Sequence, residues 1–139
     1  MPEYLTKQLV VSRRFDSRRG NAPAEFVLVG ALLVALALAV IHTALVIHVR
    51  HILHASAWEG ARYASYYGTT LGDGQALTIR LINEALSESY SLDVSVTEAS
   101  VAGAPGVHVH VRAPVPTLGL WALGGDLSVE AALPLEQPG

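Results

Sequence analysis

The sequence predicts an α+β fold: a long N-terminal helix crosses a membrane, continues outside it, and packs on a small domain of one helix and a three-stranded antiparallel sheet. Two patterns predict this fold. Residues 26–49 contain no Asp, Glu, Lys or Arg, and three later segments alternate apolar and polar residues as half-buried strands do. The composition agrees, because only 15% of the 139 residues are charged, against about 25% in soluble domains.

Composition also excludes several classes of protein. The chain has no cysteine, which excludes a disulfide scaffold, a cysteine zinc site, an iron–sulfur cluster and a thiol nucleophile. Hydrophobic types make up 51% of the residues, so the low hydrophobicity of disordered chains is excluded. The length allows about one small domain.

Residues 26–49 are long enough to span a bilayer. As a helix they extend about 36 Å, against a hydrocarbon core of about 30 Å. The polar residues within the run are His42, Thr43 and His48. The Thr43 hydroxyl can bond a carbonyl one turn back, so it costs little there. We therefore interpret the run as a transmembrane span rather than as a buried helix of a soluble protein.

The charges on either side of the run predict its orientation. Residues 1–20 hold five basic and two acidic side chains, whereas residues 21–139 hold four basic and ten acidic ones. Positive flanks stay in the cytoplasm, so we expect a single-pass protein of the cytoplasmic (inner) membrane with its N-terminus inside. The basic cluster directly precedes the span, which favours a topology signal over a nucleic-acid site.

We therefore expect three parts: a basic cytoplasmic leader over 1–20, a long helix over 21–67, and a small extracytoplasmic α+β domain over 68–139. Residues 55–57 read Ala-Ser-Ala, a pattern that signal peptidase accepts. However, the apolar run exceeds the roughly 7–15 residues of a signal peptide. Release of a secreted domain at Ala57 remains a lesser alternative.

The start of the long helix carries an unusual arrangement. Gly20 closes the basic leader, Glu25 is the fifth residue after it, and Phe26 begins the apolar run. Pro23 and an acidic residue in the first turn also suit an ordinary helix start. Taken whole, the arrangement resembles a type IV prepilin, and the Glu25-Phe26 pair is similar to that of the TadE-like pseudopilins of the Tad (Flp) pilus system.

The resemblance continues over about residues 18–136. Residues 57–64 (AWEGARYA) are similar to the stretch that follows the span in TadE-like proteins, and residues 131–136 (AALPLE) resemble the end of the family. Asn21 departs from the Phe or Met common at the first mature position of ordinary type IV pilins. This departure disfavours that branch and the type II secretion pseudopilins.

The resemblance implies a pilin-like fold and a role as a minor pilin or pseudopilin in Tad pilus assembly. A prepilin peptidase of the membrane would cut between Gly20 and Asn21, so this chain would be substrate rather than enzyme. The new terminal ammonium lies near the hydrocarbon and needs a partner. Glu25 can supply it, in its own chain or for a neighbouring subunit, and with Phe26 is the expected assembly site. The implied partners are the prepilin peptidase, other pilin subunits, the Tad assembly machinery and membrane lipid.

Beyond the span, spacing predicts the remaining helices. The first helix continues toward Tyr67 with a narrow stripe of small and apolar residues, and the glycines at 68, 72 and 74 are expected to end it. A second helix is expected over about 75–89. The stripe consists of Leu53, Ala57, Ala61 and Ala64.

Three strands follow from alternation, with the first two joined by a loop over 102–106. The residues expected to face inward are Leu92, Val94 and Val96, then Val107, Val109 and Val111, then Leu127, Val129, Ala131 and Leu133. The link over 113–125 is rich in Pro and Gly. Its apolar residues Leu118, Leu120 and Trp121 could form a contact surface or pack under the sheet.

The six histidines do not predict a metal site. His48, His51 and His54 recur at three-residue steps, and His108 and His110 share one strand face, but no acidic ligand stands beside either group. We expect solvated polar faces, with no metal and no cofactor. No Ser, His and Asp arrangement suggests nucleophilic catalysis, so we expect no catalytic residue and no enzyme activity. A single-span anchored binding protein without a filament role is the alternative to a pilin.

Overall fold

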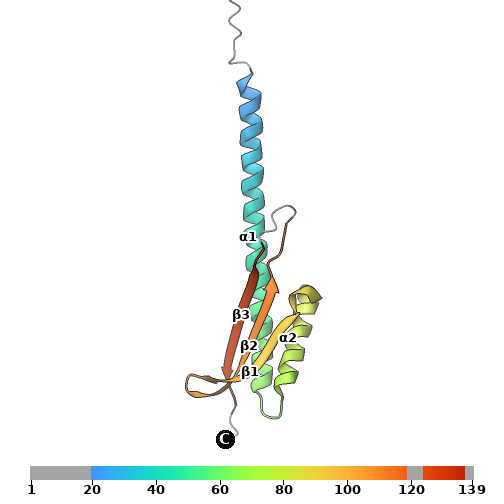
Figure 1. Cartoon of the computed structure of the whole chain (residues 1–139), viewed down its shortest axis with the longest axis vertical. Coiled ribbons are helices and arrows are strands. Elements are labelled where there is room, and N and C mark those ends of the chain that lie inside the picture. The colour runs from blue at the N-terminus through green and yellow to red at the C-terminus, as the bar shows by residue number, and fades with distance from the viewer. Residues whose placement is uncertain (1–19, 119–123, 137–139) are drawn as a thin grey trace, which may run out of the picture. The chain divides into compact units, whose positions relative to one another are not determined.

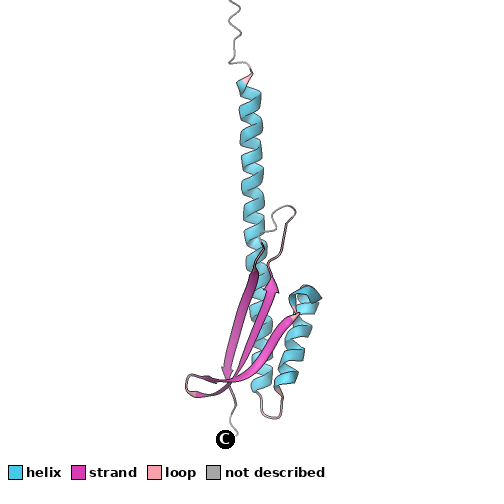
Figure 2. Ribbon diagram, in the orientation of Figure 1, coloured by secondary structure: helices cyan, strands magenta, loops and turns pink. Residues whose placement is uncertain are grey.

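The computed structural model describes residues 20–118 and 124–136. Its elements are helix α1 (Asn21–Ser65), helix α2 (Leu71–Ala85), the short 3-10 helix η1 (Glu88–Tyr90), and strands β1 (Asp93–Val101), β2 (Ala104–Pro114) and β3 (Asp126–Pro134). The strands form one antiparallel sheet in the order β1-β2-β3 (Figures 1 and 2). The predicted α+β fold, with a long apolar N-terminal helix, a second helix and three antiparallel strands, is confirmed.

The chain divides into two compact units, Met1–Ala39 and Val40–Gly139. The described part of the first unit is helical. The second unit contains the rest of α1 and every other element. Its sheet carries α1 and α2 on one face (Figure 2), and the opposite face is largely polar.

The core of the second unit lies between α1 and the sheet. The stripe on α1 expected from spacing is buried, with Leu53, Ala57 and Ala61 at 0% exposure. The inward residues of β2 are buried as expected, and Val129 and Ala131 of β3 meet the same core. The last part of α1 therefore supplies one wall of a core that the roughly 70-residue domain would lack alone.

The N-terminal residue of the first strand was predicted wrongly. Leu92 is 84% exposed and lies before β1, whereas Val94 is buried. Alternation fixes which side of a strand a residue occupies, but it does not fix where the strand begins. Here η1 precedes β1 and ends only at Tyr90, so Leu92 lies in the connecting segment.

The boundaries of the second helix also differ from the prediction. We expected glycines 72 and 74 to lie in a turn and the second helix to begin at 75, but α2 begins at Leu71 and ends at Ala85. Thr70 and Asp73 form a capping box: the Asp73 N–H donates to Thr70 Oγ1 (3.2 Å) and the Thr70 N–H donates to Asp73 Oδ2 (2.9 Å). This pair satisfies two free backbone donors and starts the helix across the glycines.

The hairpin between β1 and β2 is tighter than predicted. Strand pairing extends to Val101 opposite Ala104, which leaves only Ala102 and Gly103 in the turn. Both have positive φ (52° and 85°), as a two-residue hairpin of the tightest type requires. The expected loop over 102–106 is therefore wrong, because its last three residues belong to β2.

Candidate functional site

The residues of the predicted processing and assembly site lie at the beginning of α1. Gly20 is exposed and precedes the helix, and Asn21 is its first residue. A side chain at Gly20 would meet nothing within 4 Å. Glu25 and Phe26 are both exposed, Phe26 at 80%. Gly20 and Asn21 are both exposed. The basic residues of the predicted leader, up to Arg19, lie outside the described residues.

Helix α1 is long and apolar enough to cross a membrane. An 18-residue window within it has a mean hydropathy of 2.7, and none of that window is buried inside the protein. The large side chains of the run are exposed, for example Leu32 at 68% and Val40 at 61%. A water-exposed surface of this kind is unfavourable, so α1 requires lipid or other helices around it.

The motif after the span forms the contact between α1 and α2. Gly60 of α1 lies against Gly74 and Thr78 of α2. A Cβ added at Gly60 would lie 2.8 Å from the Gly74 carbonyl oxygen, and one added at Gly74 would lie 2.5 Å from Ala64 Cβ. Each helix therefore presents two small residues four apart, which allows close approach of the backbones. Sequence analysis placed Gly74 in a turn and missed this contact, although the four-residue spacing was there to find it.

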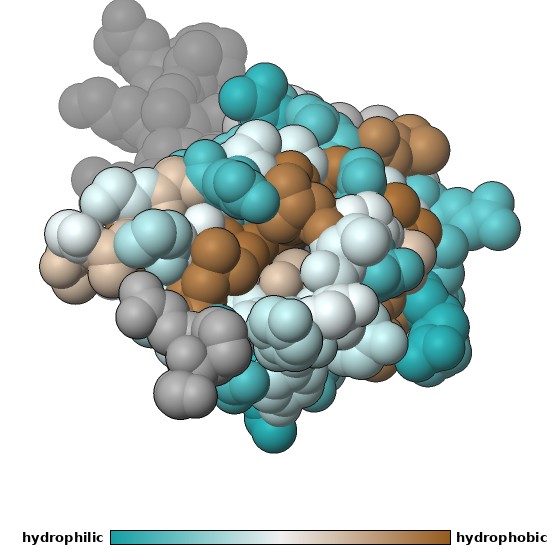
Figure 3. Space-filling model, turned by 90° about the horizontal axis from the view of Figure 1, so that it is seen from below, coloured by the Kyte–Doolittle hydropathy of each residue, from teal (hydrophilic) through white to brown (hydrophobic). Residues whose placement is uncertain are grey.

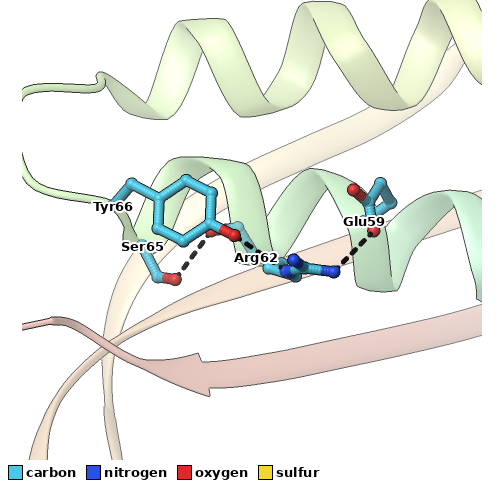
Figure 4. Close-up of polar contacts among 4 residues, drawn as sticks. All are labelled: Glu59, Arg62, Ser65 and Tyr66. Carbon is cyan, nitrogen blue, oxygen red and sulfur yellow. Dashed lines mark hydrogen bonds and ion pairs between the residues drawn. The ribbon is translucent and has the colours of Figure 1, made fainter.

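The polar residues of the same motif form a small network on the outside of α1 (Figure 4). Arg62 Nη1 lies 3.7 Å from Glu59 Oε2, as expected from their spacing, and Arg62 Nε donates to the Tyr66 hydroxyl (2.9 Å). The Tyr66 hydroxyl, through this hydrogen bond, raises the pKa of Arg62, and Glu59 adds to the effect. Since these groups are exposed, the pair contributes little stability. The network is a feature of the surface.

The end of α1 is also joined to the end of the sheet. The Ser65 hydroxyl donates to the Arg62 carbonyl (2.8 Å), and the Glu136 N–H donates to the Ser65 carbonyl (3.1 Å). The second bond satisfies one of the carbonyls left free at a helix C-terminus. Residues 131–136, which carry part of the family resemblance, thus hold the last strand against α1.

Two shallow hollows lie at the end of the domain that bears the hairpin. One, of about 420 Å³, is lined by the segment from Ala64 to Leu71 together with Glu98, Leu135 and Glu136, and the other includes residues of the hairpin. Figure 3 views the domain from below and shows an apolar area bordered by polar residues. Both linings contain hydroxyl and carboxylate side chains, and the Ser65 and Thr69 hydroxyls in the first donate to backbone carbonyls.

The six histidines lie on two elements: His42, His48, His51 and His54 on α1, and His108 and His110 on β2. Within residues 20–118 and 124–136, no three His, Asp or Glu side chains lie close enough to hold a metal ion. His110 Nε2 lies 2.9 Å from Ser128 Oγ and 3.9 Å from Glu130 Oε1 on the outer face of the sheet. His42 Nδ1, within the apolar run, is the one buried side-chain polar atom of the described part without a hydrogen-bond partner.

The linking segment over 113–125 is only partly described. Leu118 is partly buried, and the Val115 N–H donates to the Gly125 carbonyl (3.0 Å). Leu120 and Trp121, which the sequence analysis considered as a contact surface, lie outside the described residues.

These features define a class of protein: a candidate single-span membrane protein whose apolar helix continues into the core of a small α+β domain. Residues 20–62 match the family model described as TadE-like protein. The match confirms the resemblance over the start of α1, the span and the Glu59–Arg62 motif. The match covers 43 of the 139 residues. No curated protein and no solved structure matches the chain.

Proposed function

We propose that the chain is a minor pilin or pseudopilin of a Tad-type (Flp) pilus. In this proposal α1 holds it in the cytoplasmic membrane with the N-terminus inside, and a prepilin peptidase removes residues 1–20 before the subunit takes part in pilus assembly. The observation that carries the proposal is the position of the family match, which begins at Gly20, one residue before α1 starts at Asn21.

The physical chemistry of this segment supports the assignment. Gly20 has no side chain, so its backbone can approach a protease closely. Cutting there would create an ammonium group at Asn21, next to the hydrocarbon, where a charge requires a partner. Glu25 is one helical turn away and exposed, so its carboxylate can reach that ammonium or the one of a neighbouring subunit.

The surface of α1 supports an assembly role after processing. Around Gly30 an added Cβ would meet nothing within 4 Å, and the small residues at 31, 35 and 39 follow on the same helix. Small residues let helices approach closely in lipid, where van der Waals fit governs association. We therefore expect other pilin helices to be the partners of this segment.

The intact mass of the chain tests the proposal in a host that carries the Tad system. We expect the mature protein to lack residues 1–20, and Gly20→Ala to slow or block that loss. Gly30→Ala is the matched control, since Gly30 also has no neighbour within 4 Å, and it should be processed normally. Normal processing of the Gly20→Ala variant together with normal pilus assembly would contradict the proposal.

Assembly is tested separately from cleavage. We expect Glu25→Ala to reduce the number of pili while the N-terminus is still removed, because the carboxylate acts after the cut. Glu59→Ala removes an exposed carboxylate from the outer part of α1 and is the control. Equal piliation of both variants would remove the proposed role of Glu25.

An anchored binding protein without a filament role is the second candidate. It predicts an unchanged mass, with residues 1–20 retained. Release of a secreted domain at Ala57 is disfavoured by burial, because Ala57 is 0% exposed in the middle of α1 and Val49 and Leu53 before it belong to the core.

A further inference from the structure

Four nitrogen-bearing side chains lie at the end of the charge-free run of α1: His48 is the residue before its last, and the other three follow it. His48, Arg50, His51 and His54 are all exposed, and we call them the cationic collar. Helix α1 contains no carboxylate between Glu25 and Glu59. Within the described residues, no hydrogen bond or ion pair joins a collar side chain to another group. The collar is therefore free to bind a partner outside the chain.

The collar occupies the side of α1 that faces away from the domain. Val49 and Leu53, which lie between its members in the sequence, are buried in the core at 2% and 0% exposure. At about 100° per residue, the four side chains spread over roughly half of the helix circumference, opposite the buried stripe. Any partner must therefore approach α1 from the side opposite the sheet.

The height of the collar matches a lipid headgroup layer. Six residues separate His48 from His54, which corresponds to a rise of about 9 Å. Each headgroup layer of a bilayer is about 5–8 Å thick, outside a hydrocarbon core of about 30 Å. If residues 26–49 occupy that core, as the proposed function requires, the collar lies among the phosphate groups of the outer leaflet.

We propose that the collar binds the phosphate groups of anionic phospholipids in the outer leaflet. Arg50 can hold a phosphate with two parallel hydrogen bonds, and the imidazoles donate N–H groups around it. Additional Lys or Arg here would oppose the N-inside orientation, whereas the imidazoles add N–H donors.

The charged groups around the collar do not neutralise it. On α1 the nearest are Glu59 and Arg62, which pair with each other at 3.7 Å. Arg80 and Glu84 of α2 also pair with each other, also at 3.7 Å. None of the charged groups on the elements that share the core with α1 forms an ion pair with the collar: Asp73 on α2, Asp93 and Glu98 on β1, Arg112 on β2, and Asp126 and Glu130 on β3.

Spin-labelled lipids test the proposal with the full chain in phosphatidylcholine vesicles. The measurement is the share of labelled phosphatidylglycerol, relative to labelled phosphatidylcholine, that is immobilised at the protein surface. We expect phosphatidylglycerol to be preferred by about fivefold, since one cationic side chain near an anionic surface contributes about 1 kcal/mol. Equal immobilisation of the two lipids would overturn the proposal.

Two variants localise the effect. Replacing the three collar histidines (His48→Gln, His51→Gln, His54→Gln) should lower the preference for phosphatidylglycerol, and so should Arg50→Gln alone. The matched control replaces His108 and His110 of β2 by Gln and should behave as the natural chain does. An equal loss of lipid preference in this control would contradict lipid binding at the collar. The lipid preference of the natural chain decides the question even if a variant fails to fold.

A final comparison separates lipid from soluble phosphate. The preference for phosphatidylglycerol should be the same in inorganic phosphate as in sodium chloride of equal ionic strength. Displacement of labelled lipid by phosphate alone would assign the site to a soluble ion and overturn the lipid assignment. The measurement does not depend on cleavage at Gly20. A result against the pilin proposal would therefore leave the lipid-binding proposal unaffected. If neither lipid were immobilised, both membrane insertion and lipid binding by the collar would be contradicted.

Discussion

Two glycines determine how closely the helices of the domain approach. Gly60 and Gly74 face each other across α1 and α2, and the Thr78 hydroxyl, fully buried at the same place, donates to the Gly74 carbonyl (2.8 Å). A methyl group at either position would overlap neighbouring atoms, most of them backbone or packed Cβ atoms that cannot rotate away. At this scale, the Glu-Gly-Ala-Arg motif is explained by packing: its Gly60 and Ala61 are buried and only its charged ends are exposed.

Alanine substitutions test this contact. Because an overpacked contact costs about 1–3 kcal/mol, we expect Gly60→Ala and Gly74→Ala each to lower the free energy of unfolding by about that amount. Gly72→Ala is the control: it lies in the same helix turn, and its nearest neighbour would be Thr70 Oγ1 at 3.7 Å. It should be neutral or stabilise by up to about 1 kcal/mol, as alanine does in helices. Thermal unfolding of the full chain in detergent measures all three, and similar effects at the three sites would refute the packing argument.

Among the elements, α2 is the one whose beginning depends on a specific cap. Its capping box combines Thr70 with Asp73, and the Thr70 hydroxyl also donates to Asp73 Oδ2 (2.8 Å). These hydrogen bonds from Thr70 lower the pKa of Asp73 below its ordinary value. Gln75, one turn later, donates from Nε2 to the Val94 carbonyl of β1 (2.7 Å). The cap therefore fixes the start of a helix that is also tied to the sheet.

The lowered pKa of Asp73 predicts a dependence of stability on pH. A carboxyl group with a lowered folded pKa stabilises the fold above its unfolded pKa of about 3.9 and loses that contribution as the pH falls through the folded value. We expect Asp73→Asn to lower the unfolding temperature at pH 6, and the difference from the natural chain to shrink as the pH falls from about 4 toward 2. Asp93→Asn, at an exposed carboxylate at the start of β1, is the control. A difference that stays constant with pH would show that the charge of Asp73 does not contribute.

For the whole molecule, the outer part of α1 belongs to the domain. Val49, Leu53 and Ala57 are in one core with β2, β3 and Ile82 of α2. Burying Val or Leu contributes about 1.5–3 kcal/mol each, and a domain has only about 5–15 kcal/mol of net stability. The domain therefore cannot be separated from its helix without losing a large part of its stability. These core residues belong to α1, the helix that also contains the apolar run.

Truncated chains test that coupling. We expect a chain that begins at His48 to fold, with dispersed amide signals in NMR, because it retains the whole core. A chain that begins at Trp58 should be unfolded or aggregated, since it lacks Val49, Leu53 and Ala57. A folded product from Trp58 would contradict the shared core. It would also revive the secreted domain as an alternative.

Much of the fold could be predicted from the sequence because the signals are local. The apolar run, the stripe on the outer part of α1 and the alternation of β2 and β3 each depend on residues a few positions apart. The starts of β1 and α2 could not be placed as well. Leu92 continues the alternation of β1 yet is exposed, and the glycines at 72 and 74 read as a turn because glycine weakens a helix.

The sequence by itself determined the membrane-length run, the excess of basic residues before it, the inward residues of the later strands, and the Gly20–Phe26 arrangement that the family match includes. Tertiary structure alone decided that Thr70 caps α2 at its start, that a two-residue turn joins β1 to β2, and that Gly60 is required by α2. The reason is physical. Periodicity and charge act between near neighbours and can be recognised along the chain, whereas the space available to a side chain depends on which distant segment packs against it. At Gly60 that segment is Gly74 and Thr78, and only the folded chain brings them together.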